Sequence, residues 1–533
     1  MKAKSNCLIV SLIALSTFGA IATTLVNGAN QAGIIFTNTV ADSYTFPANL
    51  GDSINLRLGT TDFPGNLQLF GPDGALLKIV GSHPVKDDLI VFTATNSGTF
   101  TVLVSSYDTG GSGTYVLHLA QVPESFVVPA GDEGGAMING GNYDGTITLG
   151  DLDLYTFTAN AGDNVNLRLG TTNFVGRLGL YAPNGTLIEA VGTYPFKDDA
   201  IAYTVTNGGT YTVLVTDGYT GETGTYELHL AQVPGAFVVP AGDEGGPMTN
   251  GGNYYGTITL GDLDMFSFTA NKSDSINLRL GTTNFSAKIQ LYGSNGALLQ
   301  TVGGYPQKDE LLAYTTTNSG TFTVLISDIS GGATGTYALH LAQMPEPFIV
   351  PGGDEGGGMT NGGNYTGTIT LGDLDMWAFS ACKGDVINLE LKTTNFFGHL
   401  QLYGTNGVLL RSAGSYPVTD DLISYTATNC GTFTVLVSDV YGGEAGTYGL
   451  TASGIFDVLK LFSPVISGSD LTLKGAGGTT NALFVLYSTT NLTTAWGLWT
   501  PVLTNRFDQS RVFNYTNAYY PAQPEKYFRF VVP

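Results

Sequence analysis

Carboxylate and amide side chains recur in one fixed order at three places in this chain. An Asp-Glu pair in a glycine-rich stretch comes first, an Asn follows, and an Asp-Leu-Asp triplet ends the series within about 22 residues. Ca²⁺ takes six to eight oxygen ligands, which carboxylates, amides and backbone carbonyls on glycine-rich loops can supply. The order is compatible with calcium binding; the alternative is that these acids are solvated turn and cap residues that keep the chain negative.

Residue patterns typical of enzymes are weak or missing. A second acidic pair recurs at Asp87-Asp88, Asp198-Asp199, Asp309-Glu310 and Asp420-Asp421. Adjacent residues that enter a strand point to opposite faces, whereas a glycosidase needs two carboxylates across one cleft. Leu-His-Leu recurs at His118, His229 and His340, but Thr451 replaces the histidine in a fourth copy. The sequence has no His-Glu-x-x-His, no Gly-x-Ser-x-Gly and no phosphate-binding glycine loop, so we expect no enzyme activity.

The composition indicates an all-β protein that does not bind nucleic acid. Of 533 residues, 73 are Gly and 28 each are Tyr and Phe, while charged residues make up only 12%. Glycine turns between aromatic and β-branched runs favour short strands over a long helix or coiled coil. The net charge of −22 excludes the basic face that binds phosphate backbones.

Residues 1–29 have the pattern of a signal peptide. Lys2 and Lys4 precede an apolar run, with Ala20-Ile21-Ala22 as a cleavage site and Asn27-Gly28-Ala29 as a second choice. The alternative is an uncleaved anchor, because residues 8–26 could just span a bilayer. We expect a secreted or cell-surface protein with no transmembrane span in the mature chain.

The rest of the chain consists of four copies of one unit and a tail. Gly-Thr-Tyr begins at Gly113, Gly224, Gly335 and Gly446, and each step is 111 residues. A period this long indicates whole domains, because solenoid and propeller repeats are much shorter. Alternating runs predict a β-sandwich of about eight short strands, with one row of side chains in the core and the other in solvent. We expect sandwich repeats over residues 30–122, 123–233, 234–344 and 345–454, and a small C-terminal all-β module over 455–533.

The repeats carry three landmarks in the same order. Gly-x-Ile and Gly-Asp-x-Asp-x-aromatic-x-Phe come first, Ala-x-x-Gly-Asp follows, and Asn-x-Gly-Thr-aromatic-Thr-Val comes last. Over about residues 33–453 this order resembles the bacterial pre-peptidase C-terminal domain. The resemblance implies a jelly-roll-like β-sandwich with a non-catalytic accessory role, related to the collagen-binding segments of clostridial collagenases.

The resemblance also implies a set of calcium ligands. In the collagen-binding segments, an acidic, Asn-bearing linker and the Asp-x-Asp pair bind calcium together. Carried over to repeats two to four, the ligands are Asp132, Glu133, Asn142, Asp151, Asp153, then Asp243, Glu244, Asn253, Asp262, Asp264, then Asp354, Glu355, Asn364, Asp373 and Asp375. The family linker is Glu-Pro-Asn-Asn-like, whereas this one reads Asp-Glu-Gly-Gly, which moves the carboxylates. Repeat one keeps only Asp42, with Val40 at the other position, so we expect no complete site there.

Two cysteines lie in turns of the fourth repeat. Cys382 and Cys430 could pair in an oxidising compartment, and the alternative is two free thiols. A bridge would stabilise the fold by roughly 3–4 kcal/mol in the loop-entropy model.

We expect the protein to act by multivalent binding to an extracellular polymer, glycan or protein, with calcium stiffening the junctions between repeats. Similar weak sites at fixed spacing gain avidity on a repetitive ligand. Two alternatives stay open: a scaffold that targets a separate hydrolase to a polymer, and a structural surface-layer protein that self-associates. The tail is either a capping domain or a surface-retention signal.

Overall fold

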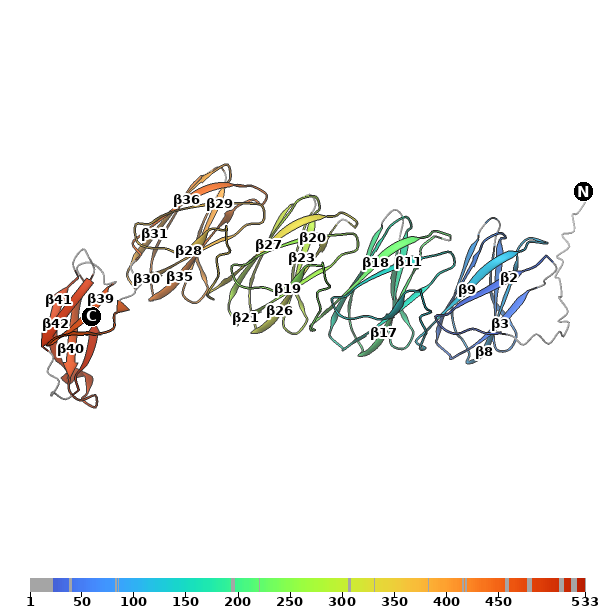
Figure 1. Ribbon diagram of the computed structural model, residues 1–533, viewed down its shortest axis with the longest axis horizontal. Helices are drawn as coiled ribbons and strands as arrows, with labels where there is room; N and C mark the ends of the chain where they lie inside the picture. The colour runs from blue at the N-terminus through green and yellow to red at the C-terminus, as the bar shows by residue number, and fades with distance from the viewer. Residues whose placement is uncertain are drawn as a thin grey trace, which may run out of the picture.

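The computed structural model is a rod of four like domains with a smaller module at its C-terminal end (Figure 1). The structure describes residues 23–37, 41–81, 84, 86–192, 197–219, 221–304, 308–329, 331–381, 383–414, 417, 419–455, 460–476, 482–507, 512–518 and 525–532. These residues contain no α-helix, and the 3₁₀ turn η1 (Trp496–Leu498) lies between two strands. No helix in this part of the chain is long and apolar enough to cross a membrane. The all-β prediction is confirmed.

Repeat 2 shows the architecture of one unit, which is a sandwich of two sheets. Its strands are β10 (Gly134–Ala136), β11 (Asn142–Ile147), β12 (Asp153–Ala159), β13 (Asn164–Thr171), β14 (Gly176–Tyr181), β15 (Leu187–Val191), β16 (Asp198–Thr204), β17 (Gly209–Asp217) and β18 (Gly224–Val233). One sheet has five strands in the order β10-β12-β17-β14-β15, and the other has four in the order β11-β18-β13-β16. β10 runs parallel to β12, and the other pairings are antiparallel.

The other three repeats have the same two sheets in the same order. Repeat 1 contains β1 (Thr23–Thr24), β2 (Asn30–Ile35), β3 (Asp42–Ala48), β4 (Ser53–Thr60), β5 (Gly65–Phe70), β6 (Leu76–Val80), β7 (Asp87–Thr93), β8 (Gly98–Ser106) and β9 (Gly113–Val122). Repeat 3 contains β19 (Gly245–Pro247), β20 (Asn253–Ile258), β21 (Asp264–Ala270), β22 (Ser275–Thr282), β23 (Ala287–Tyr292), β24 (Leu298–Val302), β25 (Asp309–Thr315), β26 (Gly320–Asp328) and β27 (Gly335–Met344). Repeat 4 contains β28 (Gly356–Gly358), β29 (Asn364–Ile369), β30 (Asp375–Ala381), β31 (Val386–Thr394), β32 (Gly398–Tyr403), β33 (Leu409–Ala413), β34 (Asp420–Thr426), β35 (Gly431–Asp439) and β36 (Gly446–Ser453).

Each repeat closes its own hydrophobic core between its two sheets. In repeat 2, Leu167 is inaccessible to solvent, and Phe157 stacks on Tyr211 with ring centroids 5.5 Å apart. Equivalent clusters fill repeats 1, 3 and 4. The alternation of apolar and polar residues along each strand supplies the inward row, as the sequence indicates.

The repeats also bury their outer sheet faces against one another. The four-stranded sheet of one repeat packs on the five-stranded sheet of the next, and we call this contact the junction. Between repeats 2 and 3 an apolar cluster joins Ala231 and Val233 to Met265, Tyr292 and Leu325. β13 is consequently buried along nearly its whole length. The expectation that its second row of side chains faces solvent is wrong, because the next repeat covers that row.

Repeat 1 begins before residue 30, which corrects the expected boundary. β1 pairs with β3, and Leu25 is buried in the core of the repeat. The Asn27 amide donates to the carbonyl oxygen of Gln121 at 2.8 Å. Residues 23–28 therefore belong to the sandwich, since they complete its five-stranded sheet. Residues 1–22, which hold most of the expected signal peptide, lie outside the described residues.

The C-terminal module is a smaller pair of sheets beyond repeat 4 (Figure 1). Its strands are β37 (Lys460–Leu461), β38 (Val465–Ser467), β39 (Asp470–Ala476), β40 (Leu483–Thr489), β41 (Thr500–Arg506), β42 (Val512–Ala518) and β43 (Tyr527–Val531). β39 pairs with β37, β38 and β42, while β40 lies between β41 and β43. Phe484, Phe507 and Phe513 fill its core, so it is built independently of the repeats.

Candidate functional site

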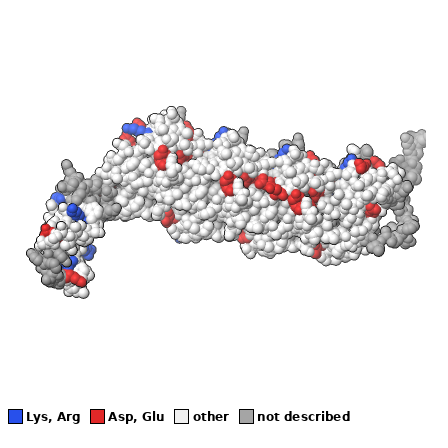
Figure 2. All heavy atoms as spheres, in the orientation of Figure 1, with Lys and Arg blue, Asp and Glu red and all other residues white. Residues whose placement is uncertain are grey.

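Three acidic clusters lie where repeats 2, 3 and 4 begin. In each, three carboxylates offer one oxygen apiece, and these oxygens lie within 4.8 Å of one another. The members are Asp132, Glu133 and Asp153 in repeat 2, Asp243, Asp262 and Asp264 in repeat 3, and Asp354, Asp373 and Asp375 in repeat 4. Glu244 and Glu355 follow the first Asp of their clusters directly. Figure 2 shows acidic side chains in a band along this face of the rod, with the few basic ones placed elsewhere on it.

A short parallel strand pairing brings the linker acids to the sheet. β10 pairs with the start of β12, whose first residue is Asp153, so Asp132 and Glu133 lie beside that carboxylate. Gly134 has a φ of +137°, and a Cβ there would come within 2.4 Å of the Leu154 carbonyl oxygen. Only glycine fits this close approach, which explains why Gly-Gly follows the acidic pair.

Asp153 is the buried member of the first cluster. Its side chain is inaccessible to solvent, and its Oδ2 accepts a hydrogen bond of 2.6 Å from the Tyr226 hydroxyl. Its Oδ1 has no hydrogen-bond partner in the part of the chain that the structure describes. Burial, and then the charge of Asp151, raises the pKa of Asp153 to about 9. A carboxyl in this position needs either a proton or a cation to neutralise it.

The same arrangement recurs in repeats 3 and 4. Tyr337 donates to Asp264 at 2.6 Å, and Tyr448 donates to Asp375 at 2.7 Å. The second oxygen of each Asp is buried without a hydrogen-bond partner among the described residues. Burial and the neighbouring Asp raise the pKa of Asp264 to about 10 and that of Asp375 to about 9. Sites made only of oxygen ligands, with one oxygen buried and unpaired, fit a hard divalent cation.

The asparagines predicted as ligands reach the cluster of the next repeat. The Asn142 amide donates to Asp243 Oδ2 of repeat 3 at 2.9 Å, and Asn253 donates to Asp354 of repeat 4 at 3.0 Å. The assignment of these asparagines to the cluster of their own repeat is therefore wrong. The physical reason is that each begins an edge strand of the four-stranded sheet, which faces the following repeat.

Asn30 of repeat 1 completes this pattern. Its amide donates to Asp132 of repeat 2 at 3.0 Å, so every cluster combines acids of one repeat with an amide of the preceding one. Asn364 lies in the last repeat, where it is exposed and has no contact with an acidic cluster among the described residues. In repeat 1, Asp42 accepts from Tyr115 at 2.6 Å but belongs to no such cluster, and Val40 lies outside the described residues.

The histidines of the Leu-His-Leu motifs contact the next repeat. His118 Nδ1 lies 3.3 Å from Asp151 Oδ1, and His340 Nδ1 lies 3.2 Å from Asp373 Oδ1. Burial lowers the pKa of His118, against the opposing effect of Asp151. Burial would raise the pKa of Asp373, but the neighbouring His340 brings it below its usual value. The motif therefore has a role at the junction, where the sequence suggested none.

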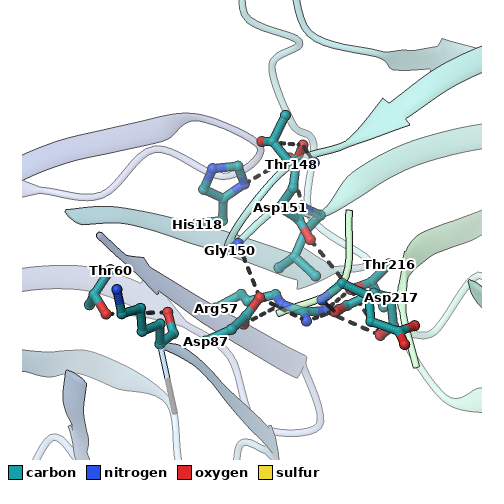
Figure 3. A network of polar contacts seen from close by, with 12 residues as sticks. Arg57, Thr60, Asp87, His118, Thr148, Gly150, Asp151, Thr216 and Asp217 are labelled. Atoms are coloured by element: carbon teal, nitrogen blue, oxygen red, sulfur yellow. Dashed lines mark hydrogen bonds and ion pairs between the residues drawn. The ribbon is translucent and has the colours of Figure 1, made fainter. Parts of the chain in front are cut away.

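A buried ion network ties the repeats together beside these contacts (Figure 3). Arg57 Nε donates to Asp87 Oδ1 at 2.7 Å, within repeat 1. Its terminal nitrogens bind Thr216 and Asp217 of repeat 2, and Asp87 accepts from the Gly150 backbone N–H at 3.2 Å. Arg57 and Asp87 are each 1% exposed, so their charges can be compensated only by one another and by the next repeat.

The network is repeated at the other two junctions. Arg168 bonds to Asp198 at 2.6 Å and lies 3.7 Å from Asp328 of repeat 3. Arg279 bonds to Asp309 at 2.7 Å and contacts Asp439 of repeat 4. Asp87, Asp198 and Asp309, which open the second acidic pairs of repeats 1 to 3, are thus junction residues, whereas Asp420 of repeat 4 is exposed.

The predicted disulfide falls partly outside the described residues. Cys430 is exposed, whereas Cys382 lies outside the described part of the fourth repeat. The pairing of these cysteines stays a prediction.

A comparison with protein families agrees with the fold. The model of the bacterial pre-peptidase C-terminal domain matches residues 151–217 and 262–328, which lie in repeats 2 and 3. The prediction of tandem domains of this kind is confirmed for repeats 2 and 3. No curated protein matches the chain.

Three of the solved structures that match this chain are only weakly similar to it over its whole length. The glycoside hydrolase domain of Endo-D from Streptococcus pneumoniae R6 is 6% identical, with a TM-score of 0.14 over 32% of this chain and 33% of that one. Tripeptidyl peptidase 2 is 10% identical, with a TM-score of 0.15 over 96% and 36%. The BSP domain of a biofilm-associated protein is 9% identical, with a TM-score of 0.12 over 81% and 97%. This chain thus spans about a third of the first two proteins, and scores this low carry no functional argument.

Sequence reasoning missed Asn30, the tyrosines that bond to the buried Asp residues, and the Arg network. A signal was present, because Arg recurs at 57, 168 and 279 and becomes Glu390 in the fourth copy. Four repeats in a row have three junctions, so a residue kept in three copies and changed in a terminal one marks a junction.

Proposed function

We propose that this protein is an extracellular, non-catalytic binding protein whose four sandwiches form a stiff row that engages a repetitive ligand. The buried junction carries this proposal, because it fixes the distance and orientation between neighbouring repeats. In Figure 1 each repeat presents the same pair of strands on the same side of the rod, from β2 and β9 to β29 and β36. Four equivalent surfaces held in this way gain avidity on an ordered polymer, and they gain less if the repeats rotate freely.

The matched family supports a non-catalytic role outside the cell. The resemblance implies an accessory domain of exported bacterial proteins. The ligand we propose is an extracellular polymer, glycan or matrix protein.

We further propose that Ca²⁺ occupies the three acidic clusters. The unpaired oxygens of Asp153, Asp264 and Asp375 support this, since a cation would replace the proton that each carboxyl otherwise holds. Because an Asn of the preceding repeat reaches each cluster, a bound ion would stabilise the junction as well as the repeat.

Binding to immobilised collagen, cellulose and chitin tests the proposed function. We expect the full chain to bind at least one of these at least tenfold more tightly than an Arg168→Glu variant, whose central junction is disrupted. The control is Lys78→Glu, which reverses an exposed charge on the edge strand β6 of repeat 1 and should bind like the wild type. Equal binding by the Arg168→Glu chain would contradict a role for the stiff row.

A Ca²⁺ titration followed by thermal denaturation tests the metal. A ligand at 100 times its Kd stabilises the folded state by about 2.7 kcal/mol per site, so the melting temperature should rise. The chain with Asp153→Asn, Asp264→Asn and Asp375→Asn keeps the shape of the protonated acids and should show no rise. A melting temperature that does not respond to Ca²⁺ in the wild type would exclude a structural calcium ion.

A further inference from the structure

Each internal junction is made by two different faces. The docking face belongs to the repeat that comes first; in repeat 2 it includes Arg168, Gly170, His229 and Ala231, all buried. The receiving face belongs to the repeat that follows; in repeat 3 it includes Met265, Tyr292, Leu325 and Asp328, also buried. The docking face recurs in repeats 1 to 3, and the receiving face recurs in repeats 2 to 4.

Repeat 4, which no repeat follows, has lost the docking face. At the positions of Arg168, Gly170, His229 and Ala231 it carries Glu390, Lys392, Thr451 and Ser453. The Glu390 and Lys392 side chains are 43% and 61% exposed and pair with each other at 2.8 Å. The replaced alanine is fully buried in the first three repeats, whereas Ser453 is exposed.

These replacements are incompatible with docking. A Cβ on Gly170 would already lie 2.3 Å from the Leu260 carbonyl oxygen of repeat 3, so a lysine at that position would push the next repeat away. A glutamate in place of Arg168 would place a third carboxylate beside Asp198 and Asp328 in a buried site. Either change removes the surface on which a further repeat could sit.

Repeat 1, the first of the four, has an altered receiving face, although Leu103 is kept at the position of Leu325. Ser43, Phe70 and Ser106 stand where repeat 3 has Met265, Tyr292 and Asp328, and all three are partly exposed. In repeats 2 to 4 the connection between the second and third strands contacts the preceding repeat, and this connection is longer in repeat 1. It runs from Ile35 to Asp42 in repeat 1 but from Ile147 to Asp153 in repeat 2, which is one residue shorter.

We infer that the two junction faces recognise only another copy of this repeat, and that both ends of the array are capped so that no second chain can add. A head-to-tail contact that does not close would otherwise extend into a fibre. Repeat arrays in general need terminal units with polar outer faces. The inference rests on the junctions alone and is independent of calcium and of the ligand proposed above.

Transplanting the cap into the middle of the full-length chain tests the inference. The variant Arg168→Glu, Gly170→Lys and His229→Thr gives repeat 2 the residues of repeat 4. We expect unchanged far-UV circular dichroism, a shorter maximum dimension in small-angle scattering, and new chymotrypsin cleavage between residues 234 and 254. A rod as long and as resistant as the wild type would overturn the inference. If the triple variant does not fold, Arg168→Glu alone is measured by the same scattering and chymotrypsin experiments.

Sedimentation of the wild-type chain gives an independent test. We expect a monomer across a hundredfold range of concentration, at both low and high salt. Concentration-dependent association that is lost on Ser106→Arg or Thr451→Asp would show that the terminal faces dock, and would also overturn the inference.

Discussion

β13 of repeat 2 and β31 of repeat 4 occupy the same place in their sandwiches but have different surroundings. Both turn leucines inward, and Leu167 and Leu389 are fully buried. The outward row of β13 is also buried, whereas the outward row of β31 is exposed or half-buried. One strand position therefore meets two requirements: its inner face builds the domain, and its outer face is adapted to whether another domain follows.

Mutations on the inner face should have the largest effect, and it should be the same in both repeats. Leu167→Ala and Leu389→Ala each remove a fully buried side chain, which we expect to cost about 3–5 kcal/mol of unfolding free energy. Denaturant unfolding of the full chain, followed by tyrosine fluorescence and circular dichroism, measures both, because repeat 2 contains tyrosines but no tryptophan. A difference of more than about 2.5 kcal/mol between the two variants, beyond the spread for Leu→Ala at buried sites, would show that the cores are not equivalent.

On the outer face the two strands should differ. Arg168→Met leaves Asp198 buried without its charge partner, which we expect to cost about 3 kcal/mol. Glu390→Met, at the matching position in repeat 4, should cause no measurable change in the unfolding midpoint. Comparable losses from both variants would mean that repeat 4 has a buried partner on this face.

The clusters at the junctions should make stability depend on pH. The pKa of Asp264, about 10, lies above the roughly 3.9 of an unfolded Asp, so the folded chain holds the extra proton. The stabilisation from that proton is complete below about pH 4 and is lost as the pH rises toward 10. In metal-free buffer we expect the melting temperature to fall between pH 5 and 9, and Asp264→Asn to reduce the slope. Asp144→Asn, at an exposed position of repeat 2, is the matched control and should leave the slope unchanged.

The smallest effect concerns one hydroxyl group of the receiving face. Tyr292 accepts from the Asn166 amide of repeat 2 at 3.1 Å, and repeat 1 has Phe70 at this position. Tyr292→Phe should cost about 1 kcal/mol, because the buried amide loses its partner. Phe70→Tyr on the outer face of repeat 1, which contacts no preceding repeat, should change nothing, and the two variants are compared by thermal denaturation.

Periodicity and alternation were sufficient to predict the domains. Spacing between identical phrases fixed the four units, and the side-chain alternation along Val165 to Leu169 predicted which residues face the core, because a strand places successive side chains on opposite sides. The same alternation was misleading for the outer row, since it cannot distinguish water from a neighbouring domain that is also partly polar.

The acidic residues of each candidate site could likewise be read from the chain, because Asp-Glu-Gly-Gly and Asp-Leu-Asp lie close together in sequence. Their partners could not. Asn30 is 102 residues from Asp132, and Arg57 is 160 residues from Asp217. The sequence alone determined a row of like sandwiches with acids at their starts. Only the tertiary structure decided that neighbouring repeats share those sites, because the stacking of one sheet on the next brings together side chains that no local pattern connects.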